Sequence, residues 1–483
     1  MDERTLNGLG ERAVAGSAAL EAKLSDTVIG FGLADDPVAL MIARTLADQL
    51  VRWFRRFVVL GQPARRELEI AAERVGSTIT IEEGEPTVTI AIGVAPADGA
   101  RIYVGADGWR MHLSRADLQP LGALGLGAPA AGFVAMLELF KGLFAEWIEG
   151  VEPGSDVHLS LFDWSTEGTD PGPEIDTVDL GDVIWIGTGA VAHGGLAALH
   201  DLPRVTGRLD LIDPDPYGES AIVRYPRASR LWNRASKPAK LAEWLRQAQP
   251  DLEVEPHTMD ANTWFASSRP DCVVRVVVTT PDSADARRHV ALKLPRIAIN
   301  GFAEGFDIGV GTYTLGQGPC LGCRYPLDEA AISELVVLNA ETGLDPRRIR
   351  ELLDTVAPLT EEDLTVIQAR LGLDETARAN LVGKPLRSAR EHLCAVGRIT
   401  TPITNTEVDV PLGFVSGFCG VAVAAELIRL SLGQMRAPGW KANLKVPIPA
   451  AADWPQAPTP DCFICGDSDF VEAYREKYGQ TGS

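Results

Sequence analysis

The 483-residue sequence is short of basic side chains: 45 Lys and Arg stand against 66 Asp and Glu, a formal charge of −21 at pH 7. A surface of that sign repels phosphate backbones and anionic lipid headgroups, which excludes nucleic acid and membranes as expected partners. The start, MDERTLNGLGERAV, lacks the basic segment and apolar core of a signal peptide. We therefore expect a cytoplasmic protein.

Few uncharged stretches are rich in apolar residues. One of them, PLGFVSGFCGVAVAA from Pro411 to Ala425, is shorter than a membrane span and ends at Glu426. It predicts a buried helix in the core of the protein.

Cysteine is scarce, with seven residues, and a disulfide framework does not fit a chain without a secretion signal. Four of them form two Cys-x-x-Cys pairs, Cys320 with Cys323 and Cys462 with Cys465. Four thiolates in two tight turns suit a structural, tetrahedral zinc ion. We predict that Zn²⁺ ties the tail of the chain to its core; two separate redox pairs are the alternative.

The sequence does contain a repeated pattern of residue types. The stretches that begin at Asp26 (DTVIGFGLADDPVALMIARTLADQL) and Asp182 (DVIWIGTGAVAHGGLAALHDLP) both read as a strand, a turn and a helix. Later in each part, small-residue helices are predicted from Gly127 and from Gly413. The repetition predicts two related α/β halves.

The strands VIWIG, LDLID, CVVRVVVTT and RIAING alternate with helical segments, which predicts a parallel, doubly wound sheet in the second half. The Gly/Pro/acidic stretch TEGTDPGPEIDT reads as a linker before it. The predicted parts are a degenerate half at 1–160, an active half at 175–326 and 395–450, a helical insertion at 327–394 and a tail at 451–483.

Gly187, Gly189 and Ala192 form a Gly-x-Gly-x-x-Ala turn after a strand, where backbone amides at a helix start bind phosphate. In the first half, GFGLADDP places Asp35 and Asp36 at that point. Since carboxylates repel phosphate, we expect a nucleotide only in the second half.

Charged residues follow the glycine turn. Asp213 and Asp215, after the next strand, can accept hydrogen bonds from ribose, which fits a nicotinamide-dependent dehydrogenase as well as an ATP-binding enzyme. Arg224, Lys237 and Lys240 then supply cations that suit a triphosphate. A solvated basic helix face is the alternative reading of these cations.

Asp282 ends the strand-like run VVVTTPDS, at the sheet edge where a carboxylate can hold Mg²⁺; a turn or helix cap is its alternative role. Cys272, in a strand, and Cys419, in the small-residue helix, are interpreted as packing residues.

The sequence resembles the ThiF/MoeB and ubiquitin-activating enzyme superfamily. The matching features follow one another in the order glycine turn, LIDPDP, the arginine, SKPAK, TTPDSADARR and the Cys-x-x-Cys pairs. The resemblance covers about Asp182–Gly433. It departs from the family's Asn-x-x-Arg at Ala221, and from its Thr-Asp-Asn at Pro281 and Ser283.

The resemblance implies two Rossmann-like adenylation domains, the first inactive, that bind ATP and Mg²⁺. It assigns Asp213 to the ribose, Arg224 and Lys237 to the phosphates and Asp282 to the metal. Lys237 is preferred over Lys240 because its spacing to the end of the following helix matches the family.

The resemblance also implies a catalytic cysteine in the crossover segment, which is Cys394; a buried structural thiol is the alternative. His392 is two residues away and points elsewhere on a helix, so it is not assigned as a base. An arginine of the inactive half often reaches the phosphates in this family, a role that falls to Arg12 or, second, Arg4.

We therefore expect a fused enzyme that adenylates the C-terminal glycine of a ubiquitin-like protein and forms a thioester for a conjugating enzyme. Its size is similar to the activating enzyme of bacterial Bil-type antiphage conjugation systems. The alternatives are activation of a sulfur-carrier protein, a NAD-dependent oxidoreductase and a scaffold without catalytic activity.

Overall fold

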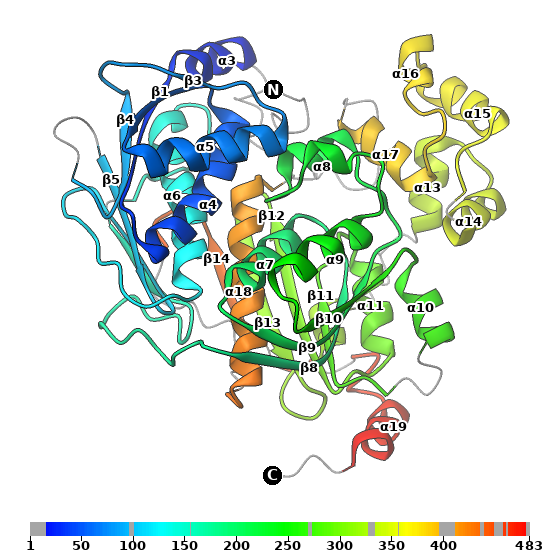
Figure 1. Ribbon diagram of the computed structural model, residues 1–483. Coiled ribbons are helices and arrows are strands. Elements are labelled where there is room, and N and C mark those ends of the chain that lie inside the picture. The colour runs from blue at the N-terminus through cyan, green and yellow to red at the C-terminus, as the bar shows by residue number, and fades with distance from the viewer. Residues whose placement is uncertain are drawn as a thin grey trace. The chain divides into compact units, whose positions relative to one another are not determined.

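The computed structural model describes residues 16–95, 101–154, 156–268, 273–326, 334–355, 357–395, 411–434, 439–448, 457–459 and 462–479. The chain divides into two compact units (Figure 1). The larger comprises Ala15–Pro326 and Pro411–Ser483, and the smaller includes Leu327–Val410.

The first half of the larger unit is built on a seven-stranded sheet with the order β3-β2-β1-β4-β5-β6-β7. Its strands are β1 (Val28–Leu33), β2 (Arg56–Leu60), β3 (Thr80–Ile81), β4 (Val88–Ile92), β5 (Arg101–Asp107), β6 (Arg110–Ser114) and β7 (Val157–Ser160). Its helices are α3 (Ser17–Asp26), α4 (Pro37–Trp53), α5 (Gln62–Val75) and α6 (Gly127–Phe144).

The second half has a sheet with the order β10-β9-β8-β11-β12-β13-β14. Its strands are β8 (Val178–Ile186), β9 (Val205–Ile212), β10 (Leu252–His257), β11 (Val276–Thr279), β12 (Ile297–Glu304), β13 (Asp307–Tyr313) and β14 (Trp440–Asn443). Its helices are α7 (Ala190–Asp201), α8 (Glu219–Arg224), the 3-10 turn η1 (Arg230–Trp232), α9 (Lys237–Ala248), α10 (Ala261–Ser268), α11 (Ala284–Leu292), α12 (Leu321–Arg324), α18 (Gly413–Ser431) and α19 (Ser468–Tyr478).

The two sheets have the same topology. In each, the first five strands in sequence are parallel neighbours in the order 3-2-1-4-5, and two antiparallel strands follow. This is the strand order of Rossmann-like domains, and it confirms the prediction of two related α/β halves.

The four strands named from the sequence, now β8, β9, β11 and β12, are parallel as predicted. The sequence did not predict β13 and β14, which extend the sheet and run antiparallel to their neighbours. Glu304 pairs with Asp307, so a turn of only two residues joins β12 to β13. A parallel return would need a crossover of a dozen or more residues, which this turn cannot provide.

Helix α18 lies at the centre of the larger unit, against both α6 and α7 (Figure 1). A side-chain carbon added at Gly194 of α7 would be 2.3 Å from the carbonyl oxygen of Gly417, so only glycine allows this crossing. Helices α6 and α18 are apolar and long enough to cross a membrane by length and composition, but 89% and 94% of their apolar windows are buried in the protein. The uncharged run at 411–425 is thus part of a buried core helix, as predicted.

The smaller unit has its own apolar core, formed mainly by leucines and isoleucines of its helices and of the turns between them. Its helices are α13 (Glu334–Thr342), α14 (Pro346–Thr355), α15 (Glu361–Leu371), α16 (Glu375–Ala379) and α17 (Leu386–Ala395). Thr360 and Asp363 form a capping box that fixes where α15 begins.

Candidate functional site

The glycine turn joins β8 to α7, as the sequence predicts. Gly187 has φ of +85°, and an added side-chain carbon there would lie 2.5 Å from the backbone nitrogen of Pro281. Both facts require glycine. Gly189 is the N-cap of α7 and has no side chain with which to bond the first amides of the helix, so these amides can donate to a bound anion.

The equivalent turn of the first half is filled by its own carboxylate. Asp36 is the N-cap of α4, and its Oδ1 accepts hydrogen bonds from the amides of Val38 at 2.8 Å and Ala39 at 3.0 Å. Pro37, the first residue of the helix, has no N–H to offer. The first amides of α4 are thus paired with a carboxylate of the protein, and the absence of a nucleotide from the first half stays a prediction.

Asp213 ties the glycine turn to the end of β9. Its carboxylate is buried and accepts the amide hydrogen of Thr188 at 2.7 Å and that of Asp215 at 2.9 Å. Burial raises the pKa of Asp213, against the lowering effect of nearby Lys237. Because a carboxylate offers about four acceptor positions, Asp213 can still accept a hydrogen bond from a hydroxyl group.

Lys237 is the first residue of α9 and is only 8% exposed. Its Nζ lies 3.1 Å from Oδ2 of Asp215 and 3.7 Å from Oδ1 of Asp213. Lys240 instead pairs with Glu243 of its own helix at 2.7 Å. A solvated helix face therefore does not describe Lys237, and the preference for this lysine over Lys240 agrees with its position beside the two acids.

A tyrosine that sequence reasoning missed brings the two cations together. The ring centroid of Tyr225 is 5.8 Å from Cζ of Arg224 and 5.9 Å from Nζ of Lys237. A side-chain carbon at Gly189 would lie 3.8 Å from the Tyr225 hydroxyl. Cation–π contacts of this kind hold Arg224 and Lys237 near the start of α7.

His193, also missed, fixes the neighbourhood of that tyrosine. Its Nδ1–H donates to the carbonyl of Pro226 at 2.8 Å, and its Nε2 accepts the hydroxyl of Tyr217 at 2.8 Å. Burial lowers the pKa of His193 to about 3, so the ring is neutral. Its only signal in the sequence was a single polar residue within an apolar helix.

Asp282 lies just beyond β11 and is exposed, and its neighbour Pro281 packs against Gly187. Ser283, not Asp282, is the N-cap of α11, since its Oγ accepts the amide of Ala286 at 3.1 Å. The helix-cap alternative for Asp282 is therefore wrong. A single carboxylate suits Mg²⁺, which keeps several waters and binds substrate phosphates.

The two Cys-x-x-Cys pairs meet. The Sγ–Sγ distances are 3.8 Å for Cys320–Cys323, 3.5 Å for Cys320–Cys462 and 3.3 Å for Cys323–Cys465, and all four sulfurs lie within 4.8 Å of one another. Four sulfurs at about 2.3 Å from a tetrahedral zinc ion are about 3.8 Å apart. The cluster can therefore hold a metal ion of that size after small adjustments.

The remaining predicted residues are the three single cysteines and the two N-terminal arginines. Cys419 is fully buried in α18, and burial raises its pKa to about 12, which supports the packing interpretation. The backbone of Cys394 belongs to the last turn of α17, and its side chain is not among the described parts of the structure. Cys272, Arg12 and Arg4 also lie outside the described residues, so their roles stay predictions.

No family model matches the sequence. The chain is similar to "Uncharacterized protein y4jF" of Sinorhizobium fredii (strain NBRC 101917 / NGR234), with 31% identity over 395 residues, which are 78% of this chain and 75% of that one. Among solved structures it is similar to those titled "Crystal structure of E. coli MccB + MccA-N7isoASN" (TM-score 0.35, 12% identity) and "Crystal structure of E. coli MccB + ATP" (TM-score 0.34, 13% identity). Each likeness covers 59% of this chain and 67% of the other.

Proposed function

The chain belongs to the same family as the uncharacterized protein y4jF, and we propose that it is an ATP-dependent adenylating enzyme. The observation that carries the proposal is the nearly buried Lys237, which lies with Arg224 and Tyr225 beside an uncapped helix start. Such a constellation is built for several negative charges at once, as in a triphosphate.

In this proposal, different residues bind the phosphates, the ribose and the metal ion of the nucleotide. The amides at the start of α7 bind a phosphate group, and Gly189 leaves room for it. Asp213 and Asp215, at the end of β9, accept hydrogen bonds from the ribose hydroxyls. Asp282, at the same edge of the sheet, would hold Mg²⁺, which neutralises phosphate charge when bound.

The reaction proposed is attack of a carboxylate on the α-phosphorus of ATP. The carboxylate is already an anion, so no base is needed; the new bond is an acyl-phosphate, and pyrophosphate leaves. Lys237 and Arg224 stabilise the negative charge that develops on the phosphate oxygens. Their role is electrostatic, and no proton moves through them.

For the substrate, we propose the C-terminal glycine of a ubiquitin-like protein, supported by the sequence resemblance. The thiolate of Cys394 then attacks the acyl-adenylate, AMP leaves, and the thioester passes to a conjugating enzyme. A bacterial antiphage conjugation system is the proposed setting, and structural zinc is the proposed occupant of the four-cysteine cluster.

Of the alternatives, activation of a sulfur-carrier protein uses the same ATP site and differs after the adenylate. A NAD-dependent oxidoreductase would use Asp213 but has no need of Lys237 and Arg224. A scaffold without catalytic activity would bind a partner and leave ATP unchanged.

The first experiment measures binding of the non-hydrolysable analogue AMPPNP with Mg²⁺ by calorimetry. Lys237→Gln, which keeps much of the side-chain volume, should weaken binding about 100-fold, because a charge-assisted contact contributes about 1.5–3 kcal/mol. Lys240→Gln is the matched control and should bind as the unaltered chain does. Equal losses in both variants, or NAD binding in preference to AMPPNP, would contradict the proposed site.

The second experiment follows chemistry. Proteins ending in Gly-Gly are screened for ATP–pyrophosphate exchange and for a covalent adduct that dithiothreitol removes. Cys394→Ala should keep exchange and lose the adduct. An adduct that persists in Cys394→Ala would rule out this nucleophile, a thiocarboxylate product would favour the sulfur-carrier alternative, and no exchange with any carboxylate would favour the scaffold.

A further inference from the structure

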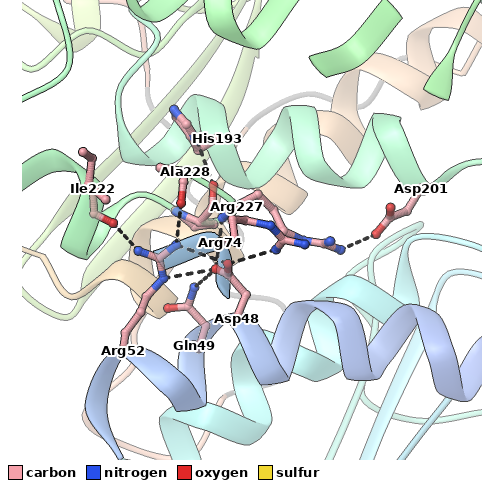
Figure 2. A network of polar contacts seen from close by, with 10 residues as sticks. Asp48, Gln49, Arg52, Arg74, His193, Asp201, Ile222, Arg227 and Ala228 are labelled. Carbon is pink, nitrogen blue, oxygen red and sulfur yellow. Dashed lines mark hydrogen bonds and ion pairs between the residues drawn. The ribbon is translucent and has the colours of Figure 1, made fainter. Parts of the chain in front are cut away.

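Buried polar side chains of the first half reach into the second half. We call the group formed by Asp48, Arg52 and Arg74 the Asp48 network (Figure 2). Asp48 and Arg52 lie on α4, and Arg74 lies on α5. The side chains of Asp48 and Arg52 are 1% and 3% exposed, so their contacts are made away from solvent.

Arg52 binds both ends of one short segment of the second half, residues 222–228. Its guanidinium donates to the carbonyl of Ile222 and, at 3.3 Å, to the carbonyl of Ala228 (Figure 2). The planar guanidinium has five N–H donors in a fixed arrangement, so it can hold two carbonyls at once.

Asp48 binds the same segment between those points. Its Oδ2 accepts the backbone amide of Arg227 at 3.0 Å, and its Oδ1 pairs with Arg52 and Arg74 at 3.2 Å each. These arginines offset the cost of burial and lower the pKa of Asp48 to about 2. Arg227 has φ of +63°, which is costly outside glycine, so this amide contact holds a strained peptide.

The segment held in this way carries Arg224 and Tyr225. Its other contacts come from the second half: His193 binds the carbonyl of Pro226, and Gly413 packs on the carbonyl of Arg224, where an added side-chain carbon would lie 2.3 Å away. The backbone around Arg224 is thus fixed from both halves of the protein.

We propose that Asp48 and Arg52 are positioning residues for the ATP site, through which the first half sets where Arg224 and Tyr225 lie. The inference rests on the proposed function. It gives a specific role to the half without a nucleotide site, since neither residue touches the phosphates and both act through the backbone of 222–228. Loss of Arg52 would free Ile222 and Ala228 and let Arg224 move away from the start of α7.

The test separates positioning from general stability by measuring two ligands. AMPPNP with Mg²⁺ uses the phosphate contacts and adenosine does not, so the ratio of their dissociation constants reports the phosphate part of the site. Arg52→Gln should lower the AMPPNP preference about 10-fold and leave adenosine binding unchanged. Arg55→Gln is the matched control three residues further on, because Arg55 donates to Val51 and Phe54 of its own half.

A double-mutant cycle then tests the route. If Arg52 acts through Arg224, the variant with both Arg52→Gln and Arg224→Ala should lose no more AMPPNP preference than Arg224→Ala alone. Asp48→Asn, which keeps the amide contact but not the ion pairs, should lose part of the preference. Additive losses, an unchanged ratio in Arg52→Gln, or equal losses for both ligands would overturn the inference while the proposed function stands. No AMPPNP binding by the unaltered chain would overturn both.

Discussion

The two halves of the larger unit share one strand order and differ at the start of one helix. In the first half, the carboxylate of Asp36 accepts the free amides at the start of α4. In the second half, Gly189 leaves the start of α7 open. The two turns therefore differ in what faces the first amides of the helix, which is a carboxylate of the protein in the first half and no cap side chain in the second.

Two groups of polar side chains, one in each half, differ in the half that they contact. The acids of the second half, Asp213 and Asp215, face Lys237 within the same half. Asp48 and Arg52 of the first half reach residues 222–228 of the other half. Under our inference, these polar groups in the core of the first half serve the site of the second half.

The largest expected difference between the halves concerns metal removal, since all seven cysteines lie from Cys272 onward and the first half has none. Cys462→Ser should reduce bound zinc from one ion per chain to none, measured by elemental mass spectrometry. The loss should destabilise the second half by several kcal/mol. A structural metal binds only the folded chain, so its binding free energy adds to the free energy of folding.

Hydrogen exchange locates that loss. Protection should fall in α19, which is anchored by the hydroxyl of Tyr474 on the carbonyl of Arg296 at 2.9 Å, and remain in α4 of the first half. Full zinc retention in Cys462→Ser would rule out this cluster as the metal site.

A single substitution gives the second half the helix cap of the first. Gly189→Asp places a carboxylate at the start of α7, where the backbone is extended and an added side-chain carbon meets nothing closer than 3.8 Å. The helix should be capped and stable, but AMPPNP binding should fall at least about 100-fold, since like charges about 4 Å apart repel by several kcal/mol.

Gly189→Ser is its uncharged control. It caps the helix without a negative charge and should retain most of the affinity, which calorimetry of both variants would measure. Undiminished binding in Gly189→Asp would place the nucleotide elsewhere.

The next prediction concerns pH and the buried His193. Its pKa is about 3 in the folded protein, against an ordinary value near 6.5. The stabilisation from the neutral ring is therefore complete above about pH 6.5, and is lost as the pH falls toward 3, at up to about 1.4 kcal/mol per pH unit. Chemical denaturation at pH 5 and pH 7.5 should give a smaller difference in His193→Gln than in the unaltered chain.

The first half supplies the control, because Leu40 lies four residues after its cap, as His193 does after Gly189. Leu40→Ala should change stability by the same amount at both pH values. An unchanged pH dependence in His193→Gln would contradict the assignment of a neutral, buried ring.

The smallest expected effect comes from Asp36→Ala. Loss of this cap should lower the free energy of unfolding by about 1 kcal/mol. AMPPNP affinity and the stoichiometry of one per chain should not change, because we expect no nucleotide in the half to which Asp36 belongs. A second bound AMPPNP in this variant would mean that Asp36 alone suppresses a site that is otherwise intact.

Features repeated along the chain were predicted well from the sequence, because they follow from local spacing. The strand–turn–helix pattern shared by the stretches from Asp26 and Asp182 predicted the paired sheets. Glycine at positions 187 and 189 predicted the open turn. The antiparallel β13 and β14 were missed, since an apolar strand pattern does not carry the direction of its neighbour.

Contacts between distant segments were harder to predict. Tyr225 and His193 belong to the site through ring packing and buried hydrogen bonds, and the sequence shows them only as single residues in mixed segments. Arg52 and Asp48 lie about 170 positions before the peptides they bind, a pairing that no local pattern specifies.

The element types, the repeat, the glycine turn and the cysteine spacing can be read from the sequence, because backbone conformation and ligand chemistry are properties of neighbouring residues. The fold was needed to show which lysine is buried beside the acids, where the four sulfurs meet, and that the first half holds residues 222–228 of the second. These depend on how buried charges find partners across the fold, since an unpaired charge in the core costs more than the fold can supply.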